Sequence, residues 1–176
     1  MRDLLRFFPR ATSSTRPLRL VRFDAQHARL SSAKWTQGVP ALNQFSDGFP
    51  VLVASTASLD ELNARLRAQG ETAVDMRRFR ANVVLGGVMA HDEDRIGTMT
   101  LGAVQLRPVK PCPRCPIPNI DPDSATIHPA VSDALQGYRQ DARVNGAVTF
   151  GMNCIPLAGV DQVLRVGQRV TADWVF

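Results

Sequence analysis

The chain has 176 residues, enough for one well-buried domain but not for a second core of similar size. Its composition, with 44% hydrophobic and 21% charged residues, excludes a disordered protein. No run of about 18 apolar residues is present, so a membrane-spanning helix is not expected. The net charge of +5 fits either an anion-binding protein or an ordinary arginine-rich surface, and charge alone favours the surface.

The amino-terminal sequence MRDLLRFFPR lacks the long apolar core and cleavage site of a secretory signal. Three cysteines, an odd number, do not make a disulfide framework. Trp35 and Trp174 lie far apart and show none of the basic-aromatic interleaving of nucleic-acid-binding surfaces. We therefore expect a cytoplasmic protein with reduced thiols and with neither nucleic-acid nor membrane partners.

The first predicted elements are two strands. RPLRLVRF, residues 16–23, alternates arginine with apolar residues, and the stretch 24–44 that follows is polar. FPVLVAS, residues 49–55, is a short apolar run that is typical of a buried strand.

SLDELNARLRAQG, residues 58–70, predicts a helix. Ser58 is the expected N-cap, and Glu61 would reach back to the amide of the cap residue. Gly70 would end the helix. The face that packs on the core is marked by three leucines at helical spacing, Leu59, Leu62 and Leu66.

RRFRANVVLGG, residues 77–87, alternates as a strand does. Its two predicted faces carry Phe79, Ala81, Val83 and Leu85 on one side, and Arg78, Arg80, Asn82 and Val84 on the other. Residues 95–110, 147–157 and 162–176 are apolar-rich and punctuated by glycine, and they predict further strands. Residues 132–140 predict a short helix or a turn. One helix near the start of many short strands indicates a mostly β fold, an antiparallel barrel with helical additions.

Two cysteines stand three positions apart in VKPCPRCPIPNIDP, residues 109–122. A thioredoxin-type pair needs Cys112 at a helix N-terminus, which the surrounding prolines disfavour. A structural zinc site needs four ligands, and Cys154 with three histidines offers no second closely spaced pair. Two buried structural thiols remain open, and so does a single thiolate ligand to a cofactor, which cations such as Arg114 would keep ionised.

Two other features carry less weight. Cys154 lies in a predicted strand and is expected in the core. The sequence HDED, residues 91–94, predicts a solvated turn more than a hard-cation site.

The segments SDGFPVLVASTASLDELN, RRFRANVVLGG, IGTMTLGAVQLRPVKPCPRC, FGMN and RVGQRV, in this order, resemble the MOSC domain family, named after the C-terminal domain of molybdenum cofactor sulfurase. Within the family the chain looks most like bacterial MOSC proteins and the mitochondrial amidoxime-reducing component. The resemblance runs from about Phe45 to the C-terminus. It implies a MOSC-type β-barrel over residues 46–176, truncated at its N-terminal side, with residues 1–45 as a remnant of the N-terminal MOSC-associated region.

The resemblance also implies a cofactor, the molybdenum cofactor, which is a pterin dithiolene with a phosphate tail. Cys115 matches the family's metal ligand and is thus the implied metal and catalytic residue. Asp47 matches a residue beside the metal, the second implied catalytic residue. Gly48 and Phe49, in the same turn, are implied to contact the cofactor.

Arg80 and Asn82 match an arginine and an asparagine that contact the cofactor in the family, and Arg78 is expected to assist them. On a strand, positions i and i+2 lie on one face about 7 Å apart. The arginine fork can bind a phosphate through two parallel bonds, and the amide can both donate to and accept from a pterin edge. Pro118 and Asn119 stand where family members commonly carry two threonines, so no role of those hydroxyls carries over.

The implied activity is that of a molybdenum-dependent oxidoreductase that reduces N-hydroxylated or N-oxygenated small molecules. Electrons would come from a separate partner with flavin or iron-sulfur, because the chain holds no further cysteine cluster. Alternatively, the chain is a non-catalytic carrier of cofactor or of sulfur, with Cys115 as persulfide or ligand, or an inactive remnant. Cys112 is expected to support the loop or to act as a resolving thiol.

Overall fold

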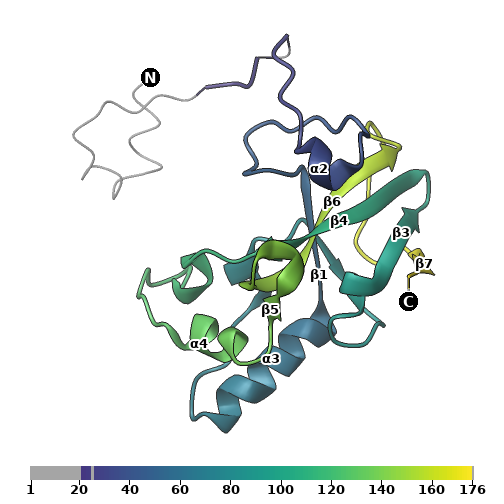
Figure 1. The fold of residues 1–176 in the computed structure, drawn as a ribbon. Helices are drawn as coiled ribbons and strands as arrows, with labels where there is room; N and C mark the ends of the chain where they lie inside the picture. The colour runs from purple at the N-terminus through teal and green to yellow at the C-terminus, as the bar shows by residue number, and fades with distance from the viewer. Residues whose placement is uncertain (1–20, 25, 176) are drawn as a thin grey trace.

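The computed structural model describes residues 21–24 and 26–175, and it is built around one seven-stranded sheet that curls into a half-barrel (Figure 1). The strand order is β2-β1-β6-β4-β3-β7, and β5 pairs with β6 outside this path. Of the strands described, only β1 and β2 pair in parallel, so the prediction of a mostly β, mostly antiparallel fold is confirmed. The strands are β1 (Val51–Ser55), β2 (Val83–Leu85), β3 (Ile96–Leu101), β4 (Val104–Pro113), β5 (Gln140–Asp141), β6 (Ala147–Ala158) and β7 (Thr171–Trp174).

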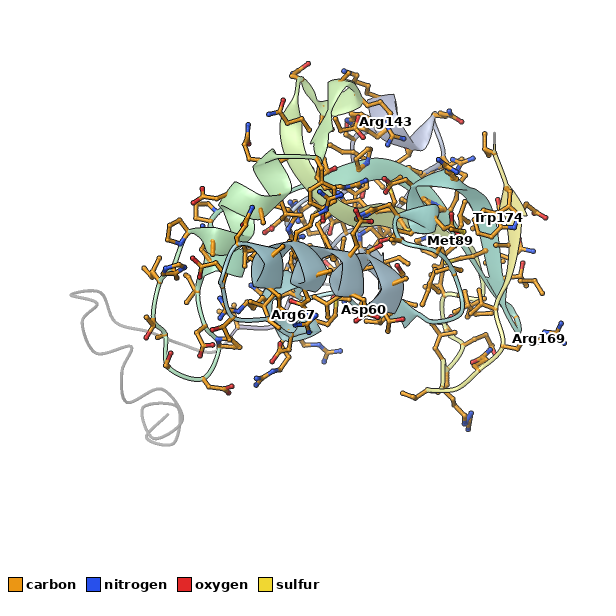
Figure 2. All side chains as sticks on the ribbon, turned by 90° about the horizontal axis from the view of Figure 1, so that it is seen from below. Asp60, Arg67, Met89, Arg143, Arg169 and Trp174 are labelled. Atoms are coloured by element: carbon orange, nitrogen blue, oxygen red, sulfur yellow. The ribbon has the colours of Figure 1, made fainter. Side chains whose placement is uncertain are left out.

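Among the residues that the structure describes, three α-helices and four 3-10 turns accompany the sheet. They are α2 (Ala33–Thr36), α3 (Thr56–Ala68), α4 (Ala130–Gln136), η2 (Met76–Phe79), η3 (Asp92–Arg95), η4 (Ile117–Asn119) and η5 (Ala142–Val144). Helices α3 and α4 lie together at one end of the molecule, and α2 lies at the other (Figure 1). The outer face of α3 carries charged side chains such as Asp60 and Arg67 (Figure 2). Within the described part of the chain, no helix is long and apolar enough to cross a lipid bilayer.

The predicted helix exists, but its N-cap was placed wrongly. It begins directly after β1, where Ser55 Oγ accepts a hydrogen bond from the Ser58 amide at 3.1 Å. Ser58 is therefore inside the helix and buried, and Glu61 does not close a capping box but pairs with Arg65. Leu62 and Leu66 are fully buried, as the spacing predicted.

The strand predicted over residues 77–87 is wrong in its first half. Asp75 caps the 3-10 turn η2 by accepting from the Arg77 amide, and Arg80 then adopts the left-handed conformation with φ of 57°. Strand β2 forms only at Val83–Leu85. Local hydrogen bonding by an Asx cap thus overrides the alternating pattern, so Arg80 and Asn82 do not share a strand face.

The two terminal strand predictions are also largely unfulfilled. Residues 16–20 lie outside the described residues, and residues 21–23 form no strand. Of residues 162–176 only Thr171–Trp174 pairs, and residues 159–170 form a loop. The predicted strands over 95–110 and 147–157 are confirmed as the hairpin β3–β4 and the long strand β6.

Two apolar clusters stabilise the fold. One lies inside the curl of the sheet, around Met99, Leu106 and Cys154. The other lies between α3, α4 and β6, where the rings of Phe79 and Phe150 stack at 3.9 Å. This second cluster fixes η2 against β6, and the site described next begins at the residue after Phe79.

Candidate functional site

A cavity of about 240 Å³ lies where three separate segments meet: the turn 45–49, the segment 79–82 and the loop 112–117. Its lining unites six of the residues singled out from sequence, Asp47, Gly48, Phe49, Arg80, Asn82 and Cys115. Cys112, Arg114 and Asn153 complete its polar lining together with Ser46. Asp47 and Cys115 therefore line the same cavity although they are 68 positions apart in the sequence.

The proline-rich loop presents one thiol and restrains the other. Strand β4 ends at Pro113, the Arg114 amide donates to Val148 O at 2.8 Å, and η4 begins at Ile117. Between these anchors Cys115 is exposed, and no hydrogen bond to it occurs within the described residues. Cys112 is half-buried, and its sulfur accepts a hydrogen bond from Arg114 Nη1 at 3.2 Å. Cys115 is therefore the thiol that is open to a ligand.

Cys154 is a core residue, as expected. It is fully buried in β6, and burial raises the pKa of its thiol well above the ordinary value. It does not line the cavity of Cys115.

Asn82 is fixed by a reciprocal pair of bonds with the main chain of β1. The main-chain N–H of Asn82 donates to Leu52 O at 2.9 Å, and the side-chain Oδ1 of Asn82 accepts from the main-chain N–H of Leu52 at 2.8 Å. These bonds settle the orientation of the side-chain amide and leave Nδ2 without a partner among the described residues. Asn82 was expected both to donate to a ligand and to accept from it. Because Oδ1 is already bonded to the Leu52 amide, only Nδ2 stays free, and it can only donate.

Arg80 lies at the end of η2 in a conformation that is uncommon for a residue with a side chain. Its amide donates to Arg77 O at 3.2 Å, which holds the turn closed. The guanidinium is exposed and forms no ion pair with a described residue. A bound anion would therefore not have to displace a carboxylate from it.

The turn that carries Asp47 is held by Arg29, a residue that the sequence analysis missed. The Arg29 guanidinium donates to three main-chain oxygens, those of Gln44 at 2.7 Å, Ser46 at 2.6 Å and Asp47 at 2.5 Å. The Asp47 side chain itself is exposed to the cavity. No local pattern could reveal this contact, because the acceptors are carbonyl groups 15 to 18 positions away.

Arg114 joins the cysteine loop to the segment of Arg80. Besides Cys112, it donates from Nη2 to Phe79 O at 3.0 Å, and its guanidinium carbon lies 5.5 Å from the centre of the Phe79 ring. Its Nε is buried and has no acceptor within the described residues. Arg114 thus sets the distance between the thiol loop and η2 and brings positive charge to the cavity.

The motif FGMN acts through packing at the base of the cavity. Phe150 stacks on Phe79, and Asn153 lines the cavity. Gly151 is required because a Cβ there would lie 2.6 Å from Val53 O, which β1 brings into close approach. The motif therefore fixes β6 against β1. Leu52, the hydrogen-bond partner of Asn82, lies in β1.

The structure places Arg78 outside this cavity. Its guanidinium donates to Pro118 O at 3.2 Å and to Asp121 Oδ2 at 2.9 Å, and its side chain is only 14% exposed. Asn119, the other residue at the threonine positions of the family, accepts from the Ser132 amide at 3.0 Å. These residues support the loop that follows Cys115 and do not face the ligand space.

The turn predicted at residues 91–94 exists as η3 but is less solvated than expected, because Glu93 is buried and its neighbours are half-buried. Glu93 is fully buried and accepts from Ser58 Oγ at 2.7 Å, and burial raises the pKa of its carboxyl. Asp94 pairs with Arg139 at 2.7 Å, and burial lowers the pKa of His91. Over the described ranges, no three His, Cys, Asp or Glu side chains cluster as a metal site, here or at Cys112 and Cys115.

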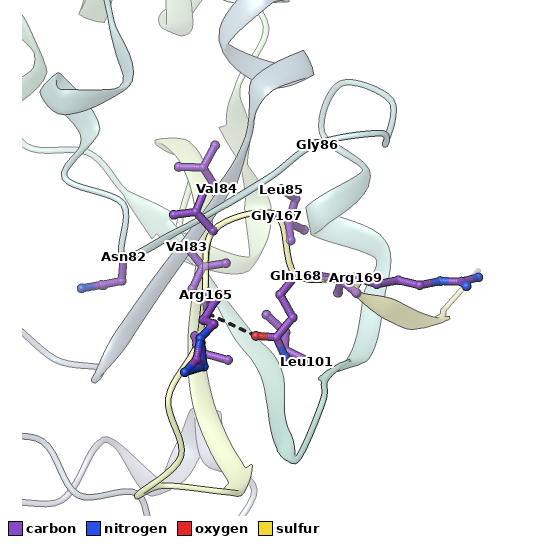
Figure 3. A pocket seen from close by; sticks show the side chains of 13 residues that line it. Asn82, Val83, Val84, Leu85, Gly86, Leu101, Arg165, Gly167, Gln168 and Arg169 are labelled. Atoms are coloured by element: carbon purple, nitrogen blue, oxygen red, sulfur yellow. Dashed lines mark hydrogen bonds between the residues drawn. The ribbon is translucent and has the colours of Figure 1, made fainter.

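Two larger cavities, each of about 740 Å³, adjoin the site through Asn82. One lies between residues 82–86 and the loop 164–170 (Figure 3). In that view the side chains of Asn82 and Arg169 point away from the cavity, and Gln168 Oε1 is occupied by the Arg165 amide at 3.2 Å. The charged residues of its lining are Arg165 and Arg169, and no carboxylate or thiol occurs among its described lining residues. The other large cavity is predominantly apolar.

The fold and the cavity define a class of protein: residues 41–171 match the MOSC domain, and the chain belongs to the MOSC domain family. Among its relatives is human mitochondrial amidoxime reducing component 2, which is 34% identical over 131 residues, covering 71% of this chain and 37% of the relative. Mouse mitochondrial amidoxime-reducing component 1 is 37% identical over 125 residues, covering 69% and 35%.

A more distant relative is the molybdenum cofactor sulfurase of Solanum lycopersicum, 28% identical over 110 residues, covering 57% of this chain and 13% of the relative. The chain spans little more than a third of the length of the human and mouse relatives just described. Membership of the family and these relatives connect the chain with the molybdenum cofactor.

Proposed function

We propose that the chain binds the molybdenum cofactor at the cavity of Cys115 and reduces N-hydroxylated or N-oxygenated small molecules. The observation that carries the proposal is the convergence on one cavity of an exposed thiol, a free guanidinium, a free amide donor and a carboxylate. The names of the relatives support the reaction class, since two of them are amidoxime-reducing components.

The donor set fits this cofactor. A soft thiolate suits a soft metal centre, and Cys115 is the exposed thiol of the loop. Arg114 Nε is a buried donor without an acceptor, which a cofactor atom could supply. Arg80 offers a guanidinium for an anionic group and Asn82 Nδ2 a donor for a ring edge. The bound cofactor would supply oxygen-atom and electron transfer chemistry.

The residues of the chain would bind and orient the reactants. Cys115 would hold the metal, while Arg114, through Cys112 and Phe79, keeps the loop at a fixed distance from η2. Asp47, on the turn clamped by Arg29, would lie beside the substrate and could accept or donate its proton. Electrons would come from a separate protein with flavin or iron-sulfur.

The test is a pair of matched substitutions, Cys115→Ala and Cys154→Ala, each purified from cells supplied with molybdate. Molybdenum content per protein should fall to background in Cys115→Ala and persist in Cys154→Ala, because Cys154 lies in the core and outside the cavity. Full molybdenum content in Cys115→Ala would refute the assignment of the metal ligand.

The exposure of Cys115 also favours a second candidate, a non-catalytic carrier that holds cofactor or a persulfide at this sulfur. Reduction of benzamidoxime with a chemical electron donor separates the two functions. Turnover supports the oxidoreductase. A persulfide on Cys115, detected by mass spectrometry in protein that shows no turnover, supports the carrier.

A further inference from the structure

Among the described residues, the lining of the apolar cavity beside the site has no ionisable side chain. The cavity occupies about 740 Å³, between the segment 40–51 and the ends of β4 and β6. Its polar lining residues are the uncharged Gln44, Ser46, Asn82 and Gln162, and its other described lining residues are apolar. The volume falls within the range of about 300–1,000 Å³ that is usual for small-molecule sites.

The burial of these residues gives the cavity a floor and a rim. Val104 and Leu106 are 6% and 3% exposed and belong to the core inside the sheet. Leu42, Phe45 and Val160 are exposed by 65%, 65% and 75%. A ligand that enters past the exposed residues therefore reaches a packed hydrocarbon surface.

The apolar cavity adjoins the site of Cys115. Phe45, Ser46 and Asn82 line both spaces, so the two cavities are neighbours. The charge of the two linings differs sharply, since Asp47, Arg80 and Arg114 line only the smaller cavity. A molecule that spans both would meet charge at one end and hydrocarbon at the other.

We infer that the apolar cavity binds the uncharged, hydrocarbon body of the substrate while its N-hydroxylated group lies in the cavity of Cys115. The inference rests on the proposed function and adds the substrate class: neutral alkyl or aryl N-hydroxy compounds. A charged substituent would be buried there without a partner, which is strongly unfavourable. Each methylene that is fully buried should tighten binding about fourfold, the equivalent of about 0.8 kcal/mol.

The first experiment compares straight-chain amidoximes from acetamidoxime to hexanamidoxime, and benzamidoxime with 4-carboxybenzamidoxime. We expect kcat/KM to rise by up to about fourfold per methylene and to fall at least tenfold on addition of the carboxylate. Equal kcat/KM values along the alkyl series, with acetamidoxime turned over, would overturn the inference.

The second experiment measures binding in the absence of turnover. Hexanamide, a neutral amide of the same length, is titrated by calorimetry into the unaltered protein and into Val160→Asp and Val163→Asp. Both valines lie in the loop 159–170 and are exposed to similar extents, 75% and 72%, but only Val160 lines the cavity. Val160→Asp should weaken hexanamide binding at least tenfold, and Val163→Asp should leave it unchanged.

The outcomes separate the inference from the proposed function. Hexanamide binding that is absent in the unaltered protein, or equal in the two variants, overturns the inference. Failure to reduce any amidoxime would refute the proposed function. Even then, hexanamide binding that is lost in Val160→Asp and kept in Val163→Asp would establish an apolar ligand site at this cavity.

Discussion

Arg29 holds the turn of Asp47 through three hydrogen bonds to main-chain oxygens, so Arg29→Met should release that turn. Methionine keeps an unbranched side chain of similar length but has no donor. The fold has no other described side chain that binds these three carbonyls, and the acceptors lie at a rim where water can replace the lost donors. We therefore expect local loosening rather than global unfolding.

The magnitude follows from the three bonds. Hydrogen bonds to charged groups contribute about 1.5–3 kcal/mol when shielded, and because water reaches these contacts we take about 1 kcal/mol each, about 3 kcal/mol in total. That difference corresponds to a change of about 100-fold in the equilibrium for opening the turn. The amide of Asn43, which donates to Arg29 O at 2.8 Å, reports on the same opening.

The assay is hydrogen exchange followed by mass spectrometry over residues 42–48. Exchange in Arg29→Met should be faster by up to about 100-fold there and unchanged in β6. Arg22→Met is the matched control, because Arg22 is exposed and forms no hydrogen bond with a described residue. Equal protection of residues 42–48 in Arg29→Met and in the unaltered protein would refute the clamp. In protein with cofactor, Arg29→Met should also lower molybdenum retention.

Two further predictions concern buried or half-buried polar groups. Arg114→Met removes the bonds to Cys112 Sγ and Phe79 O and should lower the free energy of unfolding by about 2 kcal/mol; Arg114→Lys, which cannot reach both acceptors, should recover less than half of it in urea denaturation. Glu93→Gln should change the pH dependence of stability. Burial raises the pKa of Glu93, so the folded chain binds more protons than the unfolded chain above the ordinary value of 4.5, and stability falls as pH rises through that window. Glu93→Gln should therefore gain stability relative to the unaltered protein as pH rises above the ordinary value of 4.5; a difference in stability that stays constant above this pH would contradict the raised pKa.

The fold class could be predicted from sequence because it depends on short-range patterns. Apolar runs punctuated by glycine predicted β3, β4 and β6, and three leucines predicted α3. The cap of that helix was misplaced because both Ser55 and Ser58 are capping residue types. Only the buried Glu93, which engages Ser58 Oγ from 35 positions away, distinguishes them.

The segment RRFRAN shows where pattern reading fails. Its alternation predicted a strand, but Asp75 closes the turn η2, and Arg77 and Arg78 are held by Asp123 and Asp121 from a distant loop. These ion pairs join residues more than 40 positions apart, so no local window contains them. Asp47, Arg80, Asn82 and Cys115 nonetheless line one cavity, because the order of the motifs marks these residues even where their conformation is misjudged.

What positions the site is a set of side chains that bind main-chain groups. Arg29 binds the turn of Asp47, Asn82 binds Leu52, and Arg114 binds Phe79 O. A carbonyl or amide is the same at every residue, so these partners leave no trace in the sequence. Because the anchors fix backbone rather than one another, altering an anchor should shift the shape of the cavity while its thiol, carboxylate and guanidinium remain. Anchor variants such as Arg29→Met should therefore weaken cofactor retention in graded steps, whereas Cys115→Ala should abolish it.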